Sequence, residues 1–424
     1  MLFSILKGAI LFLPFYERMV FIMNLPRQKK WLYAFSFTSC LRITDAVWVV
    51  LLAARGYSLW QIGLAEGIFH CVSLTCEIPS GMAADLMGRR RTLAFSGILG
   101  AAAALCMAFS TNYAGVCLSM AFSALSFNFI SGTQDAIVYD SLLATDASDE
   151  YIRVNANCCQ LENIGAALSD LASFLSAFLS FTGYYLLDAC ISLSRTFTAL
   201  RLAEPVVTAQ QAARTAYPFA GLCSRIKEHA VIVGRFLAHS PAAARLILAD
   251  ALLSLPGYLT LMFLQQRLSE LGLPTIWLGI PVLLVDLGRI AGTAVGARIR
   301  PRSLLGLAAV CSAGLGLGTV FAGLGGIVPA VCGAMAAAAA MDAWVLHVQR
   351  RLNELYPSDQ RATLVSVNSM VYSVLMIAVS PLTGWVGDAA GSAGAGLALL
   401  GGGLLLGALC AALALLRRAR QGGR

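Results

Sequence analysis

The chain consists mainly of apolar runs of about 20 residues, separated by short polar stretches. Runs of this length match the distance that an α-helix covers across the hydrocarbon core of a bilayer, whereas strands of a membrane barrel would alternate over about 10 residues. Only 12% of the residues are charged, about half of what a soluble domain carries. The pattern therefore predicts an all-α polytopic membrane protein.

We predict twelve transmembrane helices in two groups of six. Residues 203–243, between the sixth and seventh spans, form the longest non-apolar interval. Two equal groups joined by a long interval indicate two pseudo-symmetric six-helix bundles built as repeats. The predicted spans are 31–54, 58–82, 92–111, 114–138, 157–181, 184–202, 244–266, 275–297, 303–322, 326–349, 362–385 and 395–416. The predicted domains are an N-terminal segment (1–30), a first bundle (31–202), a central loop (203–243), a second bundle (244–416) and a tail (417–424).

The first 22 residues have two open interpretations. Their apolar stretch is short for a membrane span and is interrupted by Glu17 and Arg18. It could lie in the membrane interface, or it could be an extension ahead of a start at Met23.

Charge predicts the orientation. The turn at Arg89–Arg91 falls between the second and third spans, and most of the 30 Lys and Arg residues share its side of the predicted topology. Basic residues collect on the cytoplasmic side of membrane proteins. We therefore expect both termini in the cytoplasm and the protein in the cytoplasmic (plasma or inner) membrane. The net charge of +8 needs no nucleic-acid partner, since no basic patch with interleaved aromatic residues is present.

The same turn carries a motif. Glu77–Arg91 reads EIPSGMAADLMGRRR and contains the spacing Gly81-x-x-x-Asp85-x-x-Gly88-Arg89-Arg90. The stretches SGTQDAIVYDSLL and RATLVSVNSM lie at the end of the fourth span and the start of the eleventh. With the twelve spans, these residues resemble the major facilitator superfamily (MFS), in particular its bacterial efflux-like branches.

The resemblance implies two six-helix bundles around a central cavity and transport by alternating access. It also implies that Asp85, with Arg89 or Arg90, latches the two halves together in the outward-facing state, with Asp140 as a second carboxylate. The alternative is that these residues fix only topology and helix packing. The drug/proton exporters of this superfamily usually carry a glycine- and proline-rich motif in the fifth span. Here the fifth span has Gly165 as its one glycine and has no proline.

Ionisable residues inside the spans are candidates for a substrate or proton path, because a charge in the bilayer costs several kcal/mol unless it is paired or faces water. Arg42 and Asp45, at i,i+3, could be a structural pair or part of the path. Glu66 and His70, at i,i+4, begin a stripe that continues to Glu77. A carboxylate and a histidine suit a proton relay, although His70 could be a packing residue and Glu77 could serve the latch. The candidates are Arg42, Asp45, Glu66, His70, Asp170 and Asp342.

No nucleotide-binding, metal-spacing or nucleophile motif is present, so we expect neither an enzyme nor a cofactor nor a metal site. We predict a monomeric secondary transporter in the lipid bilayer that exports a small organic molecule, with protons as the coupling ion. The first alternative is proton-coupled uptake of a small metabolite, especially an anionic one paired with Arg42. The second is a non-transporting receptor or scaffold on the same fold.

Overall fold

The computed structural model describes residues 23–205, 227, 231, 235, 238–301, 303–355 and 361–422, without the side chains of residues 85, 86, 361–365 and 418–422. The expectations for residues 1–22 and for most of the interval 203–243 lie outside the described residues.

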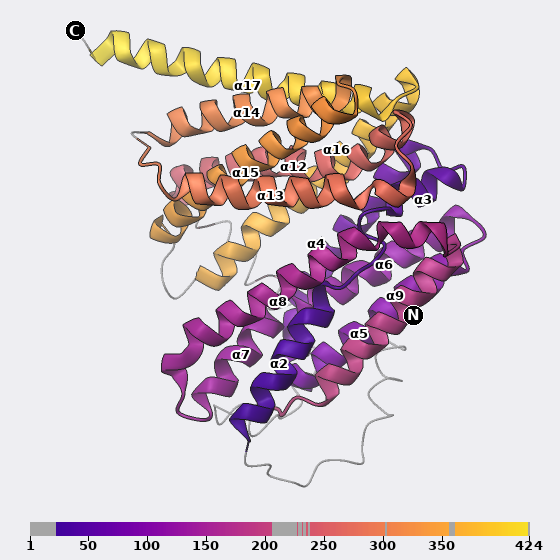
Figure 1. Ribbon diagram of the computed structural model, residues 1–424. Coiled ribbons are helices and arrows are strands. Elements are labelled where there is room, and N and C mark those ends of the chain that lie inside the picture. Colours follow the sequence, from indigo (N-terminus) through magenta and orange to yellow (C-terminus); the bar gives the residue numbers. More distant parts are fainter. Residues whose placement is uncertain are drawn as a thin grey trace.

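Two helical bundles follow one another along the chain (Figure 1). The first contains α2 (Leu25–Cys40), α3 (Trp48–Ala54), α4 (Leu59–Met87), α5 (Arg89–Ala108), α6 (Tyr113–Ile130), α7 (Thr133–Leu143), η1 (Ser148–Glu150), α8 (Tyr151–Leu171), η2 (Ala172–Ala177) and α9 (Phe181–Leu200). The second contains α12 (Pro241–Glu270), η4 (Thr275–Trp277), α13 (Gly279–Gly296), α14 (Leu304–Leu324), α15 (Ile327–Leu355), α16 (Arg361–Ala390) and α17 (Ala393–Gly422). Helical structure therefore lies at each of the predicted spans.

Among the described residues, eight helical segments are long and apolar enough to cross a membrane. They are α5, α6 with α7, α12, η4 with α13, and α14 to α17. The other predicted spans are interrupted or carry more polar side chains, as in α4, α8 and α9. Large apolar side chains such as Phe109, Ile290, Leu324 and Val328 are exposed on the outside of the bundles, where a bilayer would cover them. The chain is a multi-pass membrane protein.

The turn between α4 and α5 depends on Gly88. This residue ends α4 and precedes α5 at a φ of 88°, a conformation that residues with a Cβ atom rarely adopt. The turn therefore falls between the second and third predicted spans, as the sequence indicated. We call the end of the molecule that holds this turn the basic end, after Arg89–Arg91.

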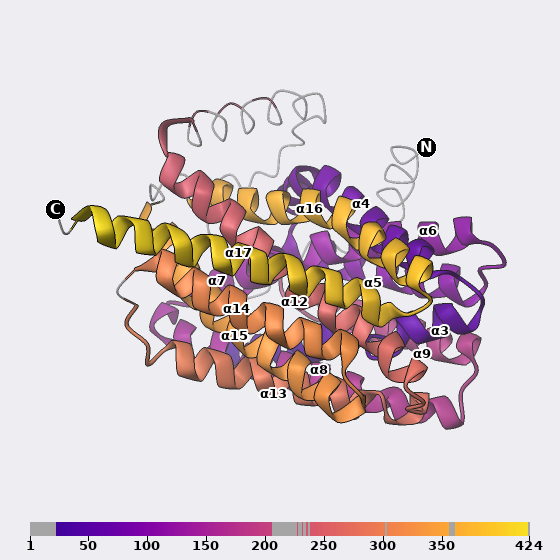
Figure 2. The same cartoon turned by 90° about the horizontal axis from the view of Figure 1, so that it is seen from above.

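The two bundles pack against each other along α4 and α16, which lie side by side in both views (Figures 1 and 2). A Cβ atom at Gly63 of α4 would collide with the carbonyl group of Ser380, and one at Gly384 of α16 with that of Leu59. Small residues at such contacts let two membrane helices approach closely.

Further contacts between the bundles join α3 to α12, η2 to η4 and α8 to α13. The first helix and α8 start at the basic end, so their last segments, α3 and η2, lie at the opposite end. The helix α13 ends at the basic end, so η4, which precedes it, also lies at the opposite end. These contacts therefore gather at the end away from the arginine turn. The bundles diverge toward the basic end (Figure 1).

The first predicted span, 31–54, is wrong as a continuous helix. The chain leaves the helix after Cys40 and re-enters it at Trp48. The intervening residues, Leu41–Val47, contain neither glycine nor proline, so the sequence gives no local signal for a break. The fourth span is likewise two helices, separated at Gly132, which has a φ of 71°.

Candidate functional site

A cavity of about 600 Å³ lies between the bundles. It is lined by the break in the first helix, by α4, α5, α6 and α9 of the first bundle, and by α12 and α16 of the second. Pockets of roughly 300–1,000 Å³ hold small organic ligands. Of the six predicted path residues, four line this cavity: Arg42, Asp45, Glu66 and His70.

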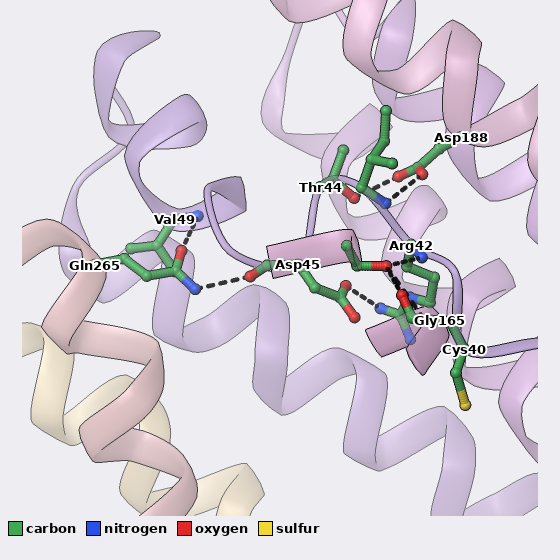
Figure 3. A network of polar contacts seen from close by, with 10 residues as sticks. Cys40, Arg42, Thr44, Asp45, Val49, Gly165, Asp188 and Gln265 are labelled. Atoms are coloured by element: carbon green, nitrogen blue, oxygen red, sulfur yellow. Dashed lines mark hydrogen bonds and ion pairs between the residues drawn. The ribbon is translucent and has the colours of Figure 1, made fainter. Parts of the chain in front are cut away.

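Two helices of the first bundle hold the start of the break. The amide of Arg42 donates a hydrogen bond to Ser169 Oγ of α8 at 2.7 Å. On α9, Asp188 accepts hydrogen bonds from the amide of Ile43 at 2.9 Å and from the hydroxyl of Thr44 (Figure 3). Backbone groups that leave a helix inside a membrane need such partners because lipid offers none.

The second bundle holds the other end of the break. Gln265 of α12, only 3% exposed, accepts a hydrogen bond from the amide of Val49 at 3.3 Å and donates one to the carbonyl oxygen of Asp45 at 2.8 Å (Figure 3). Side chains from both bundles therefore form hydrogen bonds with the backbone of this one unwound segment.

Arg42 and Asp45 form the predicted pair, with 2.9 Å between Arg42 Nη2 and Asp45 Oδ1. They do so from the break and not from a helical face. Their side chains are 53% and 44% exposed, so the pair opens into the cavity. Exposed ion pairs contribute little stability, and either partner can exchange its contact for a ligand or water.

Glu66 and His70 also pair, with 3.3 Å between Glu66 Oε1 and His70 Nε2, and both are buried. The second ring nitrogen of His70 lies 3.3 Å from the hydroxyl of Ser373 on α16. The edge of the imidazole also packs on Tyr372. An imidazole between a carboxylate and a hydroxyl can hold a proton in either tautomer or be doubly protonated.

The predicted stripe on α4 continues to Glu77, which accepts a hydrogen bond from Ser366 of α16. The stripe therefore faces the contact between the bundles along α4 and α16.

The contacts of the arginine turn that the structure describes lie within the first bundle. Arg89 Nη1 pairs with Asp140 Oδ2 of α7 at 2.6 Å. Glu204, which the sequence analysis missed, accepts the amides of Arg89 and Arg90, each at 2.8 Å. It thereby caps the start of α5, where a carboxylate is favourable. Within the described part of the chain, a Cβ atom at Gly81 would meet open space, so no described helix packs closely on it. A latch between the halves stays a prediction.

Asp170 and Asp342 lie outside the residues that line the cavity. Asp170 is buried at the end of α8, and its Oδ2 atom makes no hydrogen bond within the described part of the chain. Its charged neighbours include Asp286 and Arg289 of α13. The same two charges also interact electrostatically with Asp342. Asp286 and Arg289 pair at 3.5 Å. These residues form a second cluster, near the packing of α8 on α13.

Several residues of the site were not predicted from the sequence. Asp188 and Gln265 line the cavity and Ser169 holds the break; all three are polar residues within predicted spans, and that contrast is the one sign of their role. The same holds for Arg195 of α9, which is buried and lines the cavity. Within the described residues, no group of three or more His, Cys, Asp or Glu side chains could hold a metal ion.

No family model and no curated protein matches the chain. Solved structures do. A mutant form of the nucleoside transporter NupG matches with a TM-score of 0.70 and 17% identity, over 93% of this chain and 99% of that one. A mutant form of the peptide transporter POT matches with a TM-score of 0.67 and 15% identity, over 95% and 96%. A POT family transporter in complex with 5-aminolevulinic acid matches with a TM-score of 0.65 and 12% identity, over 94% and 97%.

These matches show the fold. The chain has the fold of the major facilitator superfamily, as the sequence predicted.

Proposed function

We propose that the protein is a secondary transporter that moves a small polar organic molecule across the cytoplasmic membrane by alternating access. The observation that carries this proposal is the cavity between two bundles that meet at one end and diverge at the other. The broken first helix supports it, since unwound helices at mid-membrane form substrate and ion sites in transporters. With the basic end in the cytoplasm, as the positive-inside rule favours, this arrangement is inward-facing.

The proton site in this proposal is the pair Glu66 and His70. It lies on α4 where α4 meets α16, so rocking of the bundles changes the surroundings of His70, including its contact with Ser373. A site whose surroundings differ between two states binds protons with different affinity in each, and this difference couples protons to transport. The titratable groups around the pair include Arg42 and Asp45 of the break, Tyr258 of α12 and Tyr372 of α16.

Two observations bear on direction. The resemblance of the arginine-turn motif to efflux-like branches favours proton-coupled export, including multidrug or metabolite efflux. The charged side chains in the cavity wall, such as Arg42, favour proton-coupled uptake of a small, anionic metabolite as the second candidate. Solved structures of the same fold named as nucleoside and peptide transporters agree with a polar cargo in either direction.

Reconstitution into proteoliposomes with an imposed pH gradient tests the proposal. A panel of nucleosides, dipeptides, organic acids and lipophilic cations is offered on each face, and proton movement is followed with a trapped pH dye. We expect one class to drive proton flux, and Glu66→Gln to abolish coupling without loss of insertion. The matched control is Glu354→Gln, a carboxylate that pairs with Arg350 and Arg351 on an exposed surface.

Substrate flux that does not depend on the pH gradient would refute the proposed proton coupling. Binding without flux for every class would instead favour a receptor or scaffold on this fold.

A further inference from the structure

The cavity does not end at the interface of the bundles. It continues into the first bundle between α5, α6 and α9, where small and hydroxyl-bearing side chains line it: Gly100, Ser119, Ser123, Ser126 and Ser192. Arg195 of α9 also lines this extension and is 4% exposed.

The guanidinium of Arg195 is only partly satisfied. Its Nη2 atom donates to the hydroxyl of Ser126 at 3.0 Å and to the carbonyl oxygen of Ser96 at 3.3 Å. Its Nε atom is buried and has no hydrogen-bond partner among the described residues. Among the residues that the structure describes, Arg195 forms no ion pair within 4.0 Å. Gly100 leaves the space for the guanidinium, because a Cβ atom there would collide with Nη2.

Nearby charges do not replace a partner for Arg195. Asp188 lies two turns earlier on α9, but both of its oxygens accept hydrogen bonds from the break. Its effect on Arg195 therefore acts through space. Arg42 adds a second positive charge, which Asp45 already pairs. A buried guanidinium without a paired anion costs several kcal/mol, and this cost falls when an anion enters the cavity.

Two further hydroxyl groups are available on the helices that line this extension. Ser123 of α6 and Ser192 of α9 line the same extension, and within the described part of the chain neither side chain makes a hydrogen bond. Arginine binds carboxylate and phosphate through paired, charge-assisted hydrogen bonds, and serine hydroxyls can donate to the remaining oxygens.

We propose that Arg195, Ser123 and Ser192 form an anion subsite that holds the carboxylate or phosphate group of the transported molecule. That the bound anion belongs to the transported molecule rests on the proposed function. Binding itself can be measured without transport. The neutral part of the ligand then extends toward the wider cavity near Tyr258 and Tyr372.

The test is equilibrium binding to the purified full-length protein in nanodiscs, with paired probes that differ only in the anion. The pairs are a nucleoside with its monophosphate and a dipeptide with its C-terminal amide, and the two pairs separate phosphate from carboxylate. In at least one pair we expect the anion to bind about tenfold more tightly, which is the size of one charge-assisted interaction. Arg195→Met should abolish the preference, and Arg195→Lys should keep part of it because charge remains without the planar fork.

Stability without ligand separates this role from a structural one. Removing a buried charge that lacks a partner should leave the melting temperature unchanged or higher in Arg195→Met, whereas loss of a structural ion pair would lower it. Ser192→Ala should weaken anion binding a few-fold. Its control is Ser194→Ala on the exposed face of the same helix, where the hydroxyl bonds only to its own helix.

Equal affinity for both members of each pair in the wild type, or an unchanged anion preference in Arg195→Met, would overturn the subsite. If the preference depends on Arg195 but proteoliposomes show no flux, the subsite stands and the transport proposal falls.

Discussion

Replacing Asp388 by alanine should weaken the closure of the two bundles at the end away from the arginine turn. Asp388, near the end of α16, accepts hydrogen bonds from the amides of Leu59 at 2.9 Å and Trp60 at 2.8 Å. These amides open α4, so a carboxylate of the second bundle caps a helix of the first. The next amide of α4, that of Gln61, donates a hydrogen bond to the hydroxyl of Ser58, the residue just before the helix. The cross-bundle cap exists only while this end is closed.

The size of the effect follows from these contacts. A carboxylate at a partly buried helix N-terminus contributes about 1–2 kcal/mol, through its charge and through the amides that it satisfies. When the bundles separate, water takes over the two amides, so most of this energy favours the closed end. Its loss should change the ratio of open to closed molecules by about 5- to 30-fold. Asp388→Asn should fall between alanine and wild type, because it keeps an acceptor oxygen and loses the charge.

Hydrogen–deuterium exchange with mass spectrometry measures this without added labels. In Asp388→Ala, the first turn of α4 should exchange faster by about the same factor. Faster exchange should also appear in η2 and η4, which meet at the same end. The control is Glu204→Ala, which removes a similar cap from α5 inside one bundle and should leave η2 and η4 unchanged. If Asp388→Ala speeds exchange in α4 alone, the carboxylate is a local cap and the gating argument is wrong.

Three further changes test other parts of the fold. Gln265→Leu should weaken cargo binding by about 30-fold or more in a titration, because it leaves two backbone groups of the break without partners, each worth about 1–3 kcal/mol; unchanged binding would show that the break is held without it. Gly384→Val should lower the melting temperature and the transport rate, because its side chain would meet the carbonyl group of Leu59, whereas Gly402→Val, at an open position, should change neither. The hydrogen bond from Lys29 lowers the pKa of Glu150, so this bridge is intact above the ordinary carboxyl range and is lost as the pH falls through the lowered pKa. Glu150→Gln should therefore remove a small acid-dependent part of the stability. Identical pH profiles of stability for the variant and the wild type would contradict this.

The positions of the helices could be predicted from the sequence because a bilayer requires a nearly fixed length of apolar residues. Helical spacing also predicted the pairs Arg42 with Asp45 and Glu66 with His70, since these contacts are local. The spacing could not show that the first pair sits in a break, because Leu41–Val47 contains ordinary residues. Their unwinding depends on side chains more than 120 residues away, such as Asp188 and Gln265, as the separations of 145 and 220 residues show.

The cavity required the same long-range information. Asp170 was a reasonable candidate as a mid-membrane carboxylate, but its helix directs it to α13 and not to the cavity. Arg195 was overlooked because one basic residue in an apolar helix does not reveal its surroundings. Only the packing of α5, α6 and α9 shows that a line of serines leads to it.

In the proposed transport cycle, the break in the first helix would link the cargo site to the state of the protein. Its start is held by Ser169 and Asp188 of its own bundle, and its end by Gln265 of the other. Rocking the bundles apart at that end must remove Gln265 and leave an amide and a carbonyl group open inside the membrane. Water or cargo then has to replace it, so cargo that bonds to the break favours one state over the other. The pair on α4 acts elsewhere, at the long contact with α16. Cargo and proton would therefore bias the same movement from two places, which is the linkage that coupled transport requires.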